Sequence, residues 1–146
     1  MTTAFASVVG AMVAQLNAAT PVSPHIYRAR MRVLPSTVQS AVVVRILGAD
    51  VDASAGQNVC GVWATAVAVE CYARASASTS PDVAVDALLE SVVTRLQQNR
   101  SLGGLVGDLV ITSVSYDFDV DGETTACATV LFSIRHATAA NSILQP

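Results

Sequence analysis

A run of acidic residues near the C-terminal end has the composition of a cation site. In residues 117–122 three aspartates alternate with apolar residues and a glycine follows, as at the start of an EF-hand calcium loop. The twelfth position of such a loop should be a bidentate glutamate, and here it is Ala128. Acids that alternate with apolar residues into an Asp-Gly turn also describe a β-hairpin with one solvated face. We favour the hairpin, and we expect no metal ion or other cofactor.

Groups for nucleophilic catalysis are few. The only histidines, His25 and His136, each stand at the edge of an extended segment and belong to no recognisable catalytic motif. The three cysteines lack the spacing of metal ligands, and their odd number is typical of reduced, buried thiols; they are Cys60, Cys71 and Cys127. The sequence therefore predicts that the protein is not an enzyme.

Arginine at every second residue is the most informative polar pattern. In a strand, Arg28, Arg30 and Arg32 would form one row of forked cations spaced about 6 to 7 Å apart. Such a row fits an acidic partner surface or a phosphate backbone. It also fits a solvated sheet face whose arginines pair with acids of a neighbouring strand, and the residues leave both interpretations open.

The first half of the chain should contain a helix and three strands. Apolar positions recur at helical spacing in residues 3–17, and an extended stretch, residues 25–34, follows two prolines. Dense β-branched residues predict a second strand at 41–47, and Gly, Ala, Asp and Ser predict a flexible loop at about 48–61. A third strand is expected at 62–73.

The second half should contain one helix and a hairpin. Ser80-Pro81-Asp82 predicts a helix start with Ser80 as N-cap, and the helix should run to about residue 98. Alternating runs at 109–118 and 124–136 surround the Asp-Gly turn, and residues 137–146 form a loose C-terminal arm. We predict one α+β domain over residues 1–146, with a mixed or mostly antiparallel sheet of about five strands and both helices on one face.

The composition favours a subunit of an assembly. The chain has 146 residues, 52% of them hydrophobic and only 13% charged, and a subunit that buries surface against its neighbours needs fewer charges. A net charge of −3 argues against a dedicated nucleic-acid binder. No apolar run is long enough to span a bilayer and the N-terminus does not read as a signal peptide, so we expect synthesis in the cytoplasm.

Several segments together resemble the bacteriophage tail terminator family, which includes minor tail protein U. The residues that carry the likeness are 69–74 (VECYAR), 86–89 (DALL), 99–105 (NRSLGGL), 116–119 (YDFD) and 132–136 (FSIRH). The resemblance implies a small α+β subunit that forms a hexameric ring on the last ring of tail tube protein and halts its polymerisation. The other side of the ring would meet the head-tail connector, and DNA would pass through the lumen without specific binding.

The same resemblance implies a location in the virion tail after assembly in the host cytoplasm. An alternative is another head-tail connector or tail completion (neck) protein. As a hypothesis, the ring or subunit interface contains Arg28, Arg30, Arg32, Asp117, Asp119, Asp121, Glu123 and Arg135. The loop at 48–61 and the arm at 137–146 are further expected contact elements that become ordered on assembly.

Overall fold

The computed structural model describes residues 2–29, 35–52, 54, 61–118 and 125–146. Two helices and five strands follow one another as α1 (Ala4–Asn17), β1 (Ile26–Arg28), β2 (Ser40–Val51), β3 (Val62–Arg74), α2 (Pro81–Gln97), β4 (Asp108–Phe118) and β5 (Thr125–Ala137). This order confirms the predicted helix, three strands, helix and two strands. The fold is α+β with a five-stranded mixed sheet, as predicted.

Both helices begin where the sequence indicates. Thr3 is the N-cap of α1, and its side-chain oxygen accepts a hydrogen bond from the backbone N–H of Ala6 at 3.2 Å. Pro81 occupies the start of α2 after Ser80, whose backbone is extended as an N-cap requires but whose side chain makes no capping hydrogen bond. The prediction of Ser80 as N-cap is therefore confirmed for its backbone conformation, but the capping hydrogen bond that a serine side chain usually makes is absent.

The sheet has the strand order β1-β2-β3-β5-β4. β1 is parallel to β2, and the other neighbours are antiparallel. Strand β1 is shorter than predicted because it ends at Arg28, after which Ala29 takes a positive φ of 50°. Residues 30–34 lie outside the described part of the chain.

Strand β2 is longer than predicted. It continues to Val51, four residues into the segment expected to be a loop, and Val51 pairs with Trp63 of β3. Pairing with a distant strand holds Gly48 and Ala49 in an extended conformation although their composition is typical of a loop. The tertiary partner thus overrides the local preference.

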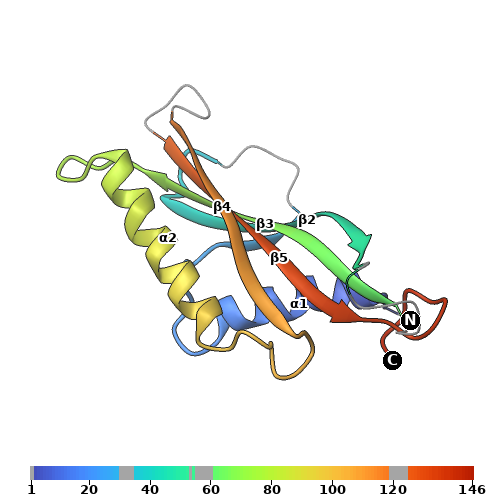
Figure 1. Cartoon of the computed structure of the whole chain (residues 1–146). Helices are drawn as coiled ribbons and strands as arrows, with labels where there is room; N and C mark the ends of the chain where they lie inside the picture. The colour runs from blue at the N-terminus through green and yellow to red at the C-terminus, as the bar shows by residue number, and fades with distance from the viewer. Residues whose placement is uncertain (1, 30–34, 53, 55–60, 119–124) are drawn as a thin grey trace.

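Both helices cover the same face of the sheet, as predicted: α2 packs against β3, β5 and β4, and α1 packs against β1 and β2. In Figure 1 this face is turned to the lower left, where both helices lie. The core between them includes Met12 of α1, Leu96 of α2 and Phe132 of β5, all fully buried. Its other members come from both helices, from alternate positions of β2, β3 and β5, and from the segment that joins α2 to β4 and the start of β4. No helix in the described ranges has the length and apolar character of a membrane span.

The C-terminal residues return to the start of α1. The backbone N–H of Ala4 donates to the carbonyl of Ile143 at 2.9 Å, and Thr3 forms a β-bridge with Leu144. Thr138 is buried, and its hydroxyl accepts a hydrogen bond from the indole N–H of Trp63 at 3.0 Å. The segment expected to be a loose arm thus lies against the N-terminal end of the helix.

Candidate assembly interface

The sequence-predicted interface residues that can be placed do not form one cluster. Arg28 ends β1 at one edge of the sheet, whereas Asp117 lies on β4 at the other edge. Arg135 of β5 pairs in register with Asp108, at the far end of the β4–β5 ladder from Asp117. The remaining residues of the hypothesis lie outside the described ranges: Arg30, Arg32, Asp119, Asp121 and Glu123.

Arg135 is engaged within its own chain. Its Nε lies 2.8 Å from Oδ2 of Asp52, which follows the end of β2. Hydrogen bonds from the Ser54 hydroxyl and backbone, together with the charge of Arg135, hold the pKa of the Asp52 carboxyl below its usual value. Arg135 therefore joins β5 to the residues that follow β2.

Arg28 forms no ion pair with a carboxylate in the part of the chain that the structure describes. Its Nη2 donates to the backbone carbonyl of Ala6 at 2.8 Å, and its guanidinium lies beside Gly10. The ion pair between neighbouring strands is made instead by Arg45 of β2 and Glu70 of β3, at 2.5 Å. Arg45 was not part of the predicted arginine row, and Arg30 and Arg32 of that row lie outside the described residues.

Strand β4 carries an exposed apolar row that the sequence analysis did not single out. Five of its side chains are 39 to 51% exposed: Val110, Ile111, Val114, Tyr116 and Phe118. β4 is the last strand of the sheet, and no described residue pairs with its outer side. We call this outer side and the five side chains the β4 edge. The available signal was the lack of any charged residue between Asp108 and Asp117.

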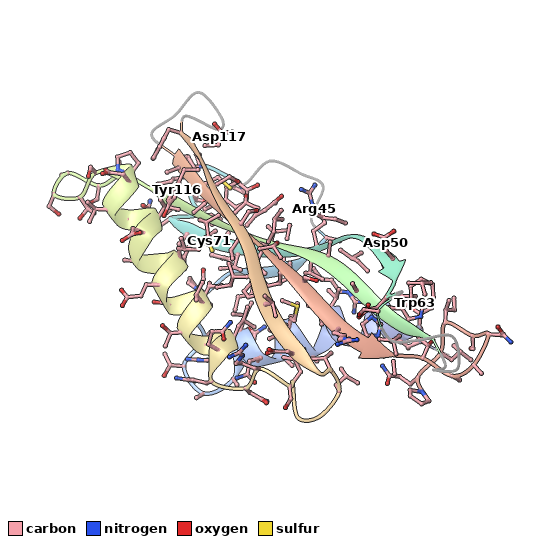
Figure 2. The ribbon with its side chains drawn as sticks, viewed as in Figure 1. Arg45, Asp50, Trp63, Cys71, Tyr116 and Asp117 are labelled. Carbon is pink, nitrogen blue, oxygen red and sulfur yellow. The ribbon has the colours of Figure 1, made fainter. Side chains whose placement is uncertain are left out.

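The β4 edge continues onto α2. The rings of Tyr116 and Phe118 are stacked, with centroids 6.3 Å apart and planes 11° apart. They line a groove whose other wall is Asp82, Val83 and Asp86 at the start of the helix. Figure 2 shows Tyr116 and Asp117 together near one end of β4. This end of the β4 edge is therefore both aromatic and acidic.

A second open edge lies across the sheet. β1 pairs only with Val42–Val44, so the later part of β2 has no described partner on its outer side. Ile46, Leu47 and Val51 are 40, 52 and 64% exposed. We call residues 45–51 the β2 edge. Arg45 and Asp50 mark its course in Figure 2.

Of the described groups with catalytic potential, His25 is partly exposed, with Nδ1 3.4 Å from the hydroxyl of Tyr27, whereas His136 and the two described cysteines are buried. Burial raises the pKa of the Cys71 thiol to about 12, and burial also raises the pKa of Cys127. Nε2 of His136 lies 2.7 Å from the hydroxyl of Thr65, but the imidazole is 3% exposed and Thr65 is fully buried. A substrate would not reach this hydroxyl–imidazole pair. Among the described residues no group of His, Cys, Asp or Glu is arranged to hold a metal ion.

Comparisons with known proteins were made by sequence and by structure. No family model matches the chain, and no curated protein matches it. A chain in the virion of a native gene transfer agent particle is similar in structure, with a TM-score of 0.47, 12% identity, and 88% of this chain and 93% of that chain covered.

A second similar structure is a chain of an extracellular contractile injection system, described as a sheath/tube terminator in the extended state. Its TM-score is 0.46 and its identity 14%, over 94% of this chain. The match spans 58% of that longer chain. TM-scores below 0.5 at such identities do not establish a role for this chain.

Proposed function

We propose that the chain is a structural subunit of a phage tail that caps the head-proximal end of the tail tube as a hexameric ring. The ring stops tube polymerisation and offers its other side to the head-tail connector. The observation that supports this proposal is the pair of different open edges, the β4 edge and the β2 edge, on one small sheet. A subunit with two different adhesive surfaces joins its copies head to tail, and a closed rotation turns such a chain of copies into a ring.

A capping role requires binding surfaces and no catalytic group, and the described residues fit this requirement. Ending a polymer requires one surface complementary to the last tube ring and another that accepts no further tube subunits. Neither surface needs a reactive group, and the Cys71 and Cys127 thiols and the Thr65–His136 pair are buried. The segments that resemble tail terminators, described above, support the same role.

The proposal is tested by adding the purified chain to growing tail tubes of its own phage. Negative-stain microscopy should show six-fold density at one end of each tube, and tube length should stop increasing at a ratio of about one ring per tube. Bovine serum albumin at equal mass is the control for crowding. Tubes that keep growing at the control rate with bare ends would show the proposal to be wrong.

The same preparation distinguishes the connector alternative. A neck or connector protein would leave growing tubes unaffected and would bind heads or terminated tails instead. Sedimentation with isolated DNA-filled heads measures that binding directly, and a tail terminator should remain in the supernatant.

A further inference from the structure

We infer that the β4 edge of one copy pairs with the β2 edge of the next copy, antiparallel, with Asp117 opposite Arg45. The inference rests on the proposed function in one respect, that copies join into a ring. It goes further by naming the two strands, their direction and their register. A second copy of this chain is the partner because the chain itself supplies both complementary edges.

The β4 edge has the properties of a strand that is covered in the assembled state. It is eleven residues long, contains no lysine, arginine or proline, and presents five half-exposed apolar side chains. Proteins usually protect an edge strand with charges, proline or short length, because its unpaired N–H and C=O groups otherwise recruit other strands. Because of the bulge between Ile111 and Ser113, Ile111 and Val114 both lie on the helix-covered face, whereas Val110, which pairs with Ser133, lies on the other face.

The proposed pairing of Asp117 with Arg45 is supported by the sheet face on which each side chain lies. Arg45 pairs with Ala68 of β3 and Asp117 pairs with Cys127 of β5, and both positions lie on the sheet face opposite the helices. A continuous sheet would therefore place the Arg45 guanidinium and the Asp117 carboxylate on one face. Arg45 already binds Glu70, and its planar fork has donors for a second carboxylate.

The same register matches the apolar residues. With Asp117 opposite Arg45, Tyr116 lies opposite Ile46 and Ile111 lies opposite Val51. All four occupy positions on the helix-covered face, since they pair with Ala128, Val67, Phe132 and Trp63 respectively. Each strand contains one bulge within this span, so the two faces agree at both ends of the contact.

A two-fold pairing of β4 with β4 fits the residues less well. It would close after two copies, and it would leave the half-exposed side chains of the β2 edge in solvent. The head-to-tail contact pairs residues 111–117 of β4 with residues 45–51 of β2, beyond the part of β2 that β1 already covers. It brings the exposed Arg45 to the exposed Asp117. The two arrangements also give different covalent products, which provides the test.

Disulfide cross-linking of the full chain tests the register. All variants are made in a Cys60→Ser/Cys127→Ser background, because Cys127 is the cross-strand partner of residue 117 within the same chain and would capture a thiol there. The double variant Arg45→Cys/Asp117→Cys is then oxidised under the conditions in which rings form. Antiparallel partners have Cα atoms about 4.5 to 5.5 Å apart, within the range of about 4.4 to 6.8 Å that a disulfide spans. Because each copy then carries both halves of the bond, we expect a ladder of covalent oligomers that ends at the ring size. Each single variant should stay monomeric on a denaturing gel.

The control and the second pair keep the test decisive. Ser91→Cys/Asp117→Cys places one thiol on the exposed side of α2, away from both edges, and should give no ladder. If the first pair fails to fold by circular dichroism, Ile46→Cys/Tyr116→Cys tests the same register. A folded pair that gives no ladder overturns the inference.

Two further outcomes separate the inference from the proposed function. Covalent dimers from the single variant Val114→Cys, with no ladder from either pair, would overturn the inference in favour of two-fold β4 pairing. Six-fold caps on tubes without a ladder would keep the proposed function and reject this interface. A ladder from a protein that leaves tubes uncapped would keep the interface and reject the proposed function.

Discussion

Replacement of Tyr116 by threonine should weaken the contact between copies far more than it disturbs the subunit. Tyr116 is 48% exposed on the β4 edge. An aromatic side chain buries about 150 to 250 Å² in all, so about 100 Å² of Tyr116 remains to be covered by a neighbour. At about 25 cal/mol for each Å², covering it contributes about 2.5 kcal/mol to association. Tyr116→Thr should therefore raise the dissociation constant of each contact about 70-fold.

Tyr116→Phe is the matched control for this change. It keeps the ring and its apolar area and removes only the hydroxyl, which makes a long 3.5 Å contact with Asp86. Analytical ultracentrifugation over a range of concentrations measures association, and urea denaturation of the dilute monomer measures the free energy of unfolding separately. We expect Tyr116→Phe to associate like the wild type within a factor of about three, which corresponds to less than about 0.7 kcal/mol.

The comparison of the two variants decides the point. If Tyr116→Thr and Tyr116→Phe have the same dissociation constant, this part of β4 is not buried between copies, and the reasoning from its exposure is refuted. If Tyr116→Thr lowers the unfolding free energy of the monomer so far that it is no longer folded, Tyr116→Leu repeats the test with a smaller loss of buried area.

Three further predictions concern the subunit itself. Burial lowers the pKa of the His136 imidazole below its usual value of 6.5, so the unfolded chain binds a proton at pH values where the folded chain does not. The free energy of unfolding should therefore fall as the pH drops below about 6.5. Urea denaturation at pH 7.5 and pH 5.5 measures this fall, which should be smaller for His136→Leu than for the wild type. Phe132→Ala removes a fully buried ring and should lower the unfolding free energy by about 3 to 5 kcal/mol in the same assay, whereas a loss below about 1 kcal/mol would contradict its place in the core. Gly61 has a positive φ of 36°, and an added Cβ would lie 2.1 Å from the hydroxyl oxygen of Thr138; Gly61→Ala should lower the melting temperature, and the double variant with Thr138→Ala should recover part of the loss.

Local signals predicted the helices and the hairpin. Thr3 and Pro81 mark helix starts through hydrogen bonds and backbone angles that involve only nearby residues. The hairpin prediction around residues 121–122 is confirmed by the pairing of Phe118 with Ala126, although the turn itself lies outside the described residues. The predicted interface was less complete, because it was built from charged residues, and it omitted the apolar β4 edge.

The alternating pattern of apolar residues by itself determined that residues 109–118 and 124–136 are strands, since that pattern depends only on the two-residue period of a strand. It did not distinguish their surroundings. β5 lies between β3 and β4 and is largely buried, whereas β4 has a neighbour on one side and exposes its apolar residues. The place of a strand in the sheet depends on which distant segments pair with it. Only the tertiary structure could therefore show that β4 and the later part of β2 are open edges with opposite charges, Asp117 and Arg45, on one face.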